Sequence, residues 1–353
     1  MAYTTIDDPT IYFNTVLYTG TNTSGTGTVT GVGFQPDFVW GKIRSTTGQH
    51  NLYDSVRGVG KRLISNGTDS EETNAAFGYL SAFDSDGFTT SAGSTNNENF
   101  NETGETFVAW NWYTGATASS NTDGSITSTV SANTTAGFSI GTYTGNSTSG
   151  ATVGHGLSDT PDCIIVKTTN ASDNWQVYHQ ALGNTSRVEL NNTDAKGTST
   201  ALWNNTSPTS SVFSLGNGSV TNSSSRNYVF YAFAEKKNYS KFGTFRGNGS
   251  TNGTFVYTGF KPAWIMTKRT DSSTGGSWQM YDNKRLGYNV DNNQMKADKT
   301  NAEDTTDGLD ILSNGFKMRN SGSSYNTSGG TYIYMAFAES PFVSSSGIPT
   351  TSR

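Results

Sequence analysis

The chain has 353 residues, of which 32% are hydrophobic, 12% are aromatic and only 14% are charged, and its formal net charge is −5. Disordered chains combine high net charge with few aromatic residues, so this composition predicts a folded protein. No basic run marks a groove for phosphates, so we expect no nucleic acid partner. The single cysteine, Cys163, lies in an apolar run and excludes a disulfide framework.

The N-terminal residues 1–15 are predicted to form a lead-in strand. They lack the basic and apolar regions of a secretory signal. No stretch of the chain approaches the roughly 20 apolar residues that a membrane-spanning helix needs. We therefore expect synthesis in a host cytoplasm without a signal peptide, and no membrane partner.

Short strands separated by turn residues are predicted over the next hundred residues. Residues 29–34 alternate between apolar and small residues, residues 38–43 have the pattern of a strand buried on both faces, and residues 51–54 form a further strand. Residues 84–87, Asp-Ser-Asp-Gly, predict a tight turn. Only residues 69–78 have any helical pattern, so the predicted fold class is all-β.

A set of markers occurs three times along the chain. Each copy has a proline that opens an apolar run, a lysine six residues later, and a tyrosine further on. The prolines are Pro36, Pro161 and Pro262, the lysines are Lys42, Lys167 and Lys268, and the tyrosines are Tyr53, Tyr178 and Tyr281. Successive prolines are 125 and 101 residues apart, and successive tyrosines are 125 and 103 residues apart. Because the prolines and the tyrosines have nearly the same spacings, we expect a repeated fold. We also expect structural roles for the three tyrosines.

The repeat length is roughly a hundred residues, which is the size of a small domain. We therefore expect three tandem β-sandwich repeats of jelly-roll-like form. The predicted boundaries are 1–115 for the first repeat with its lead-in, 116–136 for a Ser/Thr-rich linker, 137–238 for the second repeat, and 239–353 for the third repeat with a C-terminal tail. The linker would leave the first repeat more freedom than the other two.

Three histidines were considered as catalytic or metal-binding groups. His50 and Asp54 resemble half of a catalytic triad, but His50 takes the place that Trp175 and Trp278 hold in the other copies, so we interpret it as a packing residue. His179 likewise replaces an aspartate of the other copies. Histidines scattered in this way support no zinc site, and we expect no metal and no cofactor.

Acidic residues offer two further hypotheses. The Asp-Ser-Asp-Gly stretch at 84–87 resembles the start of a calcium loop, but Thr95 stands where that loop needs its glutamate. Glycoside hydrolysis needs two facing carboxylates. The acids that could supply such a pair are Glu102, Glu105, Glu235 and Glu339. They neither cluster nor repeat as a pair, so we predict that the protein is not an enzyme.

Two places remain where contact with a ligand is a hypothesis. Asp54 and Arg57, like Asp282 and Arg285, have the spacing of a local ion pair, which either ties down a turn or contacts a ligand. Trp203 lies in a polar stretch at 202–208, where an exposed indole would suit stacking on a sugar ring. Alternatively, the tryptophan covers the edge of its own core. Trp203 is the one binding residue that the sequence nominates.

Several longer motifs carry a resemblance to a known family. They are Met1-Ala2-Tyr3-Thr4-Thr5, Leu17-Tyr18-Thr19-Gly20, Gly31-Val32-Gly33-Phe34-Gln35-Pro36-Asp37-Phe38-Val39-Trp40, Leu52-Tyr53-Asp54-Ser55-Val56-Arg57-Gly58, Phe83-Asp84-Ser85-Asp86-Gly87-Phe88, Phe107-Val108-Ala109-Trp110-Asn111-Trp112 and Pro341-Phe342-Val343-Ser344-Ser345-Ser346-Gly347-Ile348-Pro349-Thr350-Thr351. In these motifs, and over essentially its whole length, the chain resembles a family of virion-associated proteins of tailed bacteriophages from marine bacteria.

The resemblance implies a structural protein located in the phage virion, with other virion proteins as partners. A tail fibre or tail-associated adhesin that contacts a host-surface glycan or protein is the first expectation, and a homotrimer is the usual arrangement of such fibres. A capsid decoration protein is the alternative. A virion glycan depolymerase is the least favoured interpretation.

Overall fold

The computed structural model describes residues 5–285, 289 and 293–341. The predicted all-β class is confirmed. Within the described part of the chain, helix is confined to four short turns: the 3-10 helices η1 (Pro9–Ile11) and η2 (Gln180–Leu182), and the α-helices α1 (Thr200–Trp203) and α2 (Ser219–Asn222). The helical pattern over 69–78 gives no helix, only the two-residue strand β6 and turns. The start of the predicted lead-in, residues 1–4, and the predicted C-terminal tail from residue 342 lie outside the described residues.

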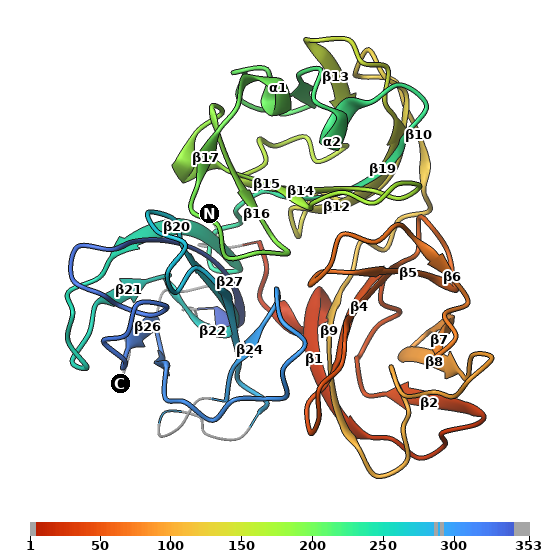
Figure 1. Cartoon of the computed structure of the whole chain (residues 1–353), viewed down its shortest axis with the longest axis vertical. Coiled ribbons are helices and arrows are strands. Elements are labelled where there is room, and N and C mark those ends of the chain that lie inside the picture. The colour runs from red at the N-terminus through yellow and green to blue at the C-terminus, as the bar shows by residue number, and fades with distance from the viewer. Residues whose placement is uncertain (1–4, 286–288, 290–292, 342–353) are drawn as a thin grey trace.

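Three lobes surround a common centre (Figure 1). The first lobe pairs a six-stranded antiparallel sheet, in the order β1-β9-β3-β4-β5-β6, with a three-stranded sheet, β2-β8-β7. Its strands are β1 (Phe13–Thr19), β2 (Thr26–Thr30), β3 (Phe38–Ile43), β4 (His50–Asp54), β5 (Lys61–Ile64), β6 (Glu72–Thr73), β7 (Tyr79–Asp84), β8 (Gly87–Ser91) and β9 (Thr106–Trp112). The turn predicted at 84–87 is confirmed, since Asp84 pairs with Gly87 at the end of the β7–β8 hairpin.

The second lobe has an eight-stranded sheet, in the order β10-β11-β12-β19-β14-β15-β16-β17, and a two-stranded sheet, β13-β18. Its strands are β10 (Ser119–Asn121), β11 (Ser128–Asn133), β12 (Phe138–Thr144), β13 (Ala151–Gly154), β14 (Cys163–Thr168), β15 (Gln176–His179), β16 (Ser186–Glu189), β17 (Gly197–Thr198), β18 (Val212–Leu215) and β19 (Asn227–Phe233). Strands β10 and β11 extend the sheet beyond β12, where the first lobe has no counterpart.

The third lobe has a five-stranded sheet, β20-β27-β22-β23-β24, and a three-stranded sheet, β21-β26-β25. Its strands are β20 (Ser240–Arg246), β21 (Phe255–Tyr257), β22 (Phe260–Arg269), β23 (Trp278–Asp282), β24 (Met295–Lys296), β25 (Leu309–Leu312), β26 (Gly315–Met318) and β27 (Thr331–Pro341). One strand order therefore occurs in all three large sheets: β1-β9-β3-β4-β5, β12-β19-β14-β15-β16 and β20-β27-β22-β23-β24.

Each large sheet is buried on both faces. One face packs on the small sheet of its own lobe, forming a separate apolar cluster in each lobe. The other face points to the centre, where Phe38 of the first lobe, Phe138 of the second and Trp264 of the third belong to one cluster. All six residues of β3 are therefore buried, as the apolar run at 38–43 predicted. A sheet that is covered on two sides favours apolar residues at consecutive rather than alternate positions, and in β3 the apolar run is interrupted by the buried Lys42.

The linker predicted over 116–136 is wrong. This segment forms β10 and β11, and β11 pairs with β12 along six residues. Ile126 and Val130 from the same segment are buried in the core of the second lobe. Threonine favours strands, so a Ser/Thr-rich composition is compatible with a sheet as well as with a linker. The prediction that the first lobe moves more freely than the other two is also wrong. Its inner core residues belong to the same apolar cluster as those of the other two lobes.

The lobes are joined by hydrogen bonds that run in one direction around the centre. The ring nitrogen Nε1 of Trp175, in the second lobe, donates to the carbonyl oxygen of Ile64 in the first (2.8 Å). Trp278 Nε1 of the third lobe donates to the Glu189 carbonyl of the second (2.8 Å), and His50 Nε2 of the first lies 3.0 Å from the Lys296 carbonyl oxygen of the third. Because each carbonyl lies in or at the end of an equivalent strand, the three contacts close a ring.

Candidate functional site

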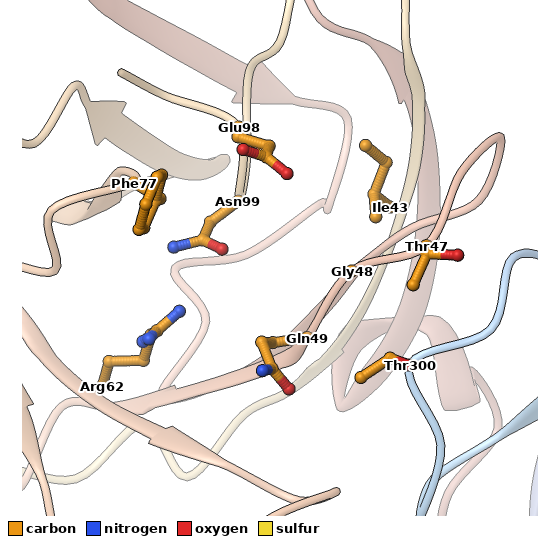
Figure 2. A pocket seen from close by; sticks show the side chains of 9 residues that line it. All are labelled: Ile43, Thr47, Gly48, Gln49, Arg62, Phe77, Glu98, Asn99 and Thr300. Atoms are coloured by element: carbon orange, nitrogen blue, oxygen red, sulfur yellow. The ribbon is translucent and has the colours of Figure 1, made fainter. Parts of the chain in front are cut away.

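One concave site lies between the first lobe and a loop of the third (Figure 2). Its volume is ≈330 Å³, and its lining residues are Ile43, Thr47, Gly48, Gln49, Arg62, Phe77, Glu98, Asn99 and Thr300. We call this site the Phe77 pocket. The backbone N–H of Gly48 donates to the carbonyl oxygen of Thr300 (2.8 Å), which joins the two lobes at the edge of the pocket.

Phe77 is the exposed aromatic residue of this pocket. Its side chain is 45% exposed, whereas most large apolar side chains of this protein are buried. The turn that carries it ends at Gly78, which has a φ of 97°, and a Cβ at this position would lie 2.3 Å from Asn97 Oδ1. Glycine is required there, because other residues rarely adopt this conformation and no space exists for a side chain.

The loop at 97–99 holds the Phe77 turn in place. The backbone N–H of Asn99 donates to the carbonyl oxygen of Phe77 (2.8 Å), and the Asn99 side-chain amide donates to the carbonyl oxygen of Gly78 (3.1 Å). The Thr95 N–H also donates to the Ala76 carbonyl oxygen (2.8 Å). These contacts fix the backbone of the turn that carries the exposed ring, so little backbone entropy would be lost when a ligand stacks on it.

Arg62, on β5, supplies the cationic group of the pocket. Its guanidinium donates to Asn51 Oδ1 (3.0 Å) and to Glu72 Oε2 (2.5 Å). Its Nε is buried and has no hydrogen-bond partner. A buried donor without a partner carries an energetic cost that a ligand oxygen would remove. Glu98 is exposed at the opposite side of the hollow in Figure 2 and adds a carboxylate acceptor.

The pocket therefore combines an exposed aromatic face with hydrogen-bond donors and acceptors. Its charges are nearly balanced, since Arg62 is paired with Glu72 and faces Glu98 across the hollow. Such a lining suits an uncharged ring that has an apolar face and several hydroxyl groups, as a sugar has. It does not suit a metal ion, and no group of three histidine, cysteine or acidic side chains among the described residues could hold one.

Trp203 is buried, as the alternative interpretation expected, so it offers no exposed indole for stacking on a sugar ring. The tryptophan ends helix α1 and is only 2% exposed. Its indole packs edge-on against Tyr178, with ring centroids 5.9 Å apart, in the core of the second lobe. The polar sequence conceals this burial, because the one-turn helix directs both Leu202 and Trp203 into the core while residues 205–207 remain exposed.

The other nominated residues have structural contacts. His50 is fully buried, and its Nδ1 accepts a hydrogen bond from Trp40 Nε1 (2.9 Å). It therefore occupies a packing position. Asp86, in the predicted turn, accepts from the backbone N–H groups of Gly31 and Gly33 (3.1 and 2.6 Å). Thr89 Oγ1 donates to Asp84 (2.7 Å). Both carboxylates thus fix loops of the first lobe.

The four acids considered for catalysis have separate side-chain contacts, although the Glu105 backbone N–H donates to the Glu102 carbonyl oxygen (3.1 Å). Glu235 pairs with Lys241 (2.5 Å), and Glu339 pairs with Lys261 (2.8 Å). Glu105 accepts from the Ser45 hydroxyl. Glu102 lines no cavity with them, and its buried Oε2 has no hydrogen-bond partner. None of these side-chain contacts joins two carboxylates.

The two Asp–Arg pairs lie at the contacts between lobes. Arg57 binds Asp54 (2.5 Å), which also accepts from the Tyr231 hydroxyl of the second lobe (2.7 Å). Arg285 binds Asp282 (2.7 Å), which also accepts from Trp110 Nε1 of the first lobe (2.9 Å). Both carboxylates are buried. The pairs therefore join lobes, although the partly buried Arg57 also lines a cavity of ≈370 Å³.

Phe77 was missed by sequence reasoning because it lies within the stretch that carried a helical pattern. Its signal was an aromatic residue directly before Gly78, at the end of the polar stretch 66–74 and the two alanines that follow it. No helix in the described ranges has the length and apolarity to cross a membrane.

The chain belongs to a family that is described as a domain of unknown function (DUF7483), whose model matches residues 8–341. Searches of curated proteins and of solved structures found no match.

Proposed function

We propose that the protein is a structural component of a phage virion, of the tail fibre or tail-associated adhesin kind, and that its Phe77 pocket binds a sugar ring of a host-surface glycan. The resemblance in the sequence motifs supports the virion role. The observation that carries the binding role is the exposed Phe77 beside the unpartnered Nε of Arg62. An aromatic face and a desolvated donor in one hollow are what a saccharide requires.

The way the lobes are joined supports a load-bearing role. Three large sheets share one aromatic core, and each lobe donates a ring N–H to the next. A particle component must keep its shape outside a cell. Separation of any one lobe would expose part of this core and break these hydrogen bonds, so the lobes resist separation together.

A capsid decoration protein is the second candidate, and one observation favours it. The three lobes have the same strand order in their large sheets and lie around one centre (Figure 1). This arrangement is like that of three subunits in a trimer. The predicted homotrimer is therefore not needed to cover the inner faces of the large sheets. A compact body that needs no further subunits suits attachment to a shell.

A virion glycan depolymerase remains the least favoured role, and we propose that the protein is not an enzyme. Glu98 is the only carboxylic acid among the described residues that line the Phe77 pocket. Hydrolysis of a glycosidic bond ordinarily needs two carboxyl groups on opposite sides of that bond.

The test of the binding role is the variant Phe77→Ala, compared with Val59→Ala as a matched control. Val59 is exposed to a similar degree, at 48%, but does not line the pocket. We expect Phe77→Ala to reduce binding of purified protein to envelope polysaccharide extracted from the host, while both variants keep the thermal unfolding temperature of the wild type. Equal binding by both variants would remove the pocket from the proposal.

The test of the virion role is the copy number per particle, measured by quantitative mass spectrometry of purified virions. Tens of copies or fewer would support a tail location, and hundreds would support decoration of the capsid. Absence of the protein from purified particles would contradict both candidates.

A further inference from the structure

The third lobe carries two exposed aromatic residues that the other lobes lack. Strand β21 has Val256 paired with Phe316, as β2 has Val29 paired with Phe88 and β13 has Val153 paired with Phe213. The three valines are buried and equivalent. On either side of them the first lobe has Thr28 and Thr30, the second has Thr152 and Gly154, and the third has Phe255 and Tyr257.

These two aromatic side chains are not needed by the fold. Phe255 is 46% exposed and Tyr257 is 59% exposed, and both lie on the outer face of β21, because residues two apart in a strand point to the same side. The fold tolerates threonine at both places in the first lobe. Packing therefore does not explain why the third lobe has aromatic residues at these two exposed positions.

Tyr257 also lines a cavity of ≈560 Å³ at the contact between the second and third lobes. The second lobe contributes Asp162 and Gln180, and the connection to β20 contributes Glu235 and Asn238. We call this site the Tyr257 cavity. None of its lining residues belongs to the Phe77 pocket.

Asn238 gives an independent sign that this cavity binds a ligand. The residue is only 5% exposed, yet its side-chain Nδ2 has no hydrogen-bond partner. Its backbone is held in the left-handed region, with a φ of 63°. A Cβ placed on Gly259 would lie 3.6 Å from both Asn238 Oδ1 and the Tyr257 hydroxyl, so the amide oxygen, an acceptor, and the phenol flank the same part of the cavity. A buried amide donor without a partner is costly unless a ligand acceptor meets it.

The carboxylates of the cavity supply acceptors in fixed positions. Asp162 Oδ2 accepts from the backbone N–H of Glu235 (2.6 Å). Burial raises the pKa of Asp162 to about 6. Glu235 is bound by Lys241 Nζ (2.5 Å) and by the backbone N–H of Phe242 (3.3 Å). The cavity therefore presents an amide donor, carboxylate acceptors and an aromatic face with little excess charge.

We propose that the Tyr257 cavity is a second saccharide-binding site, in which one sugar ring stacks on Tyr257 and hydrogen-bonds to Asn238 and Asp162, while Phe255 contacts the next ring of the glycan. Sugar hydroxyls both donate and accept, which matches the amide and the carboxylate, and the C–H face of the ring matches the aromatic side chains. Phe255 and Tyr257 are about 7 Å apart along the strand, so a glycan of two or three rings can contact both. The site does not depend on the proposed function of the Phe77 pocket.

The experiment measures binding of the full chain to an array of immobilised bacterial glycans. The variants are Tyr257→Ala, Asn238→Gly, Phe77→Ala and the double variant Phe77→Ala/Tyr257→Ala. Asn238→Gly removes the amide but keeps the left-handed backbone, which glycine adopts readily. Tyr257 is exposed, so its replacement should leave thermal unfolding unchanged.

We expect Phe77→Ala to retain binding to a subset of glycans, and Tyr257→Ala and Asn238→Gly each to weaken that binding roughly tenfold, the scale of a binding hot spot. The double variant should lose binding altogether. Loss of the Phe77 site alone would leave the Tyr257 signal intact, so failure of one site is distinguishable from failure of the other.

Two results would overturn this inference. The first is that Phe77→Ala binds no glycan. The second is that Tyr257→Ala and Asn238→Gly bind as the wild type does. If the first result comes with a concentration-dependent dimer in light scattering that Tyr257→Ala abolishes, the aromatic pair of edge strand β21 is instead an interface between two copies of the chain.

Discussion

The indole Nε1 of Trp278 donates to the carbonyl oxygen of Glu189, 2.8 Å away, and so joins β23 of the third lobe to β16 of the second. This bond has a counterpart at each of the other two contacts between lobes, made by Trp175 and by His50. All three ring residues are buried. The bonds supply buried donors to carbonyl groups at the ends of strands, and the Lys296 carbonyl oxygen also accepts from the Lys299 backbone N–H (3.0 Å).

Trp175→Phe should lower the free energy of unfolding by about 1–3 kcal/mol, because the carbonyl group of Ile64 loses its buried donor. The matched control is Trp203→Phe. Trp203 is equally buried, but its Nε1 has no hydrogen-bond partner. Both changes remove the same atoms, so denaturant unfolding of the two variants isolates the hydrogen bond. Equal losses would mean that the bond to Ile64 contributes nothing measurable.

Tyr281→Ala should cost about 2–4 kcal/mol of stability, because it removes a fully buried ring from the core of the third lobe. The Tyr281 hydroxyl also donates to Gln294 Oε1 (3.0 Å). Tyr281→Phe keeps the ring and removes only this hydrogen bond, so it should cost about 1 kcal/mol. Calorimetric unfolding of both variants measures the difference, and an unchanged unfolding temperature for Tyr281→Ala would refute a structural role.

Asp282→Ala should destabilise the protein by about 3–5 kcal/mol, because it leaves the buried Arg285 charge without its main partner. The same change removes the acceptor of Trp110 Nε1. Replacement of both charges by Asp282→Leu/Arg285→Met should cost less than the single change, since no unpaired charge remains. Urea unfolding compares the two variants. A double variant less stable than Asp282→Ala would contradict this account.

Three buried lysines at equivalent positions predict an alkaline rise in stability. Burial lowers the pKa of Lys42 to about 7 and those of Lys167 and Lys268 to about 8. Between these values and the pKa of about 10.4 in the unfolded chain, the unfolded state binds more protons than the folded state. Stability should therefore increase with pH across this window and stay at its lower level below pH 7.

The measurement is the unfolding temperature from about pH 7 to pH 9, below the pKa of about 10 at which tyrosines of the unfolded chain ionise. The variant Lys42→Met should show a smaller rise than the wild type. Lys284→Met is the control, because Lys284 is exposed and its replacement should leave the slope unchanged. A wild-type curve that is flat or falling over this window would disprove the prediction.

Acid should destabilise the protein partly through His50. Nδ1 of this ring accepts from Trp40 Nε1, so a second proton would face another N–H group. Burial and the nearby Lys42 hold the pKa of His50 well below its usual value. Stability is then lost as pH falls below the unfolded value of about 6.5. The variant His50→Gln should show a shallower loss between about pH 6.5 and pH 5 in urea unfolding, and an unchanged slope would exclude this role.

Local patterns in the sequence were sufficient to predict the all-β class, the hairpin turn at 84–87 and the burial of β3. Each of these depends on neighbouring residues alone: turn chemistry, or a largely apolar run. The interpretation of His50 as a packing residue also came from the sequence, because the other copies have tryptophan in its place.

Tertiary structure alone decided how the lobes are joined and where the concave sites lie. The segment 116–136 has a composition that suits a linker, yet it forms strands because the neighbouring sheet offers β12 as a partner. Trp203 is buried and Phe77 is exposed, although both lie in polar stretches, because the side that a side chain faces depends on the path of the backbone. Hydrogen bonds around the centre connect residues more than eighty positions apart in the sequence, and no local pattern encodes such a contact.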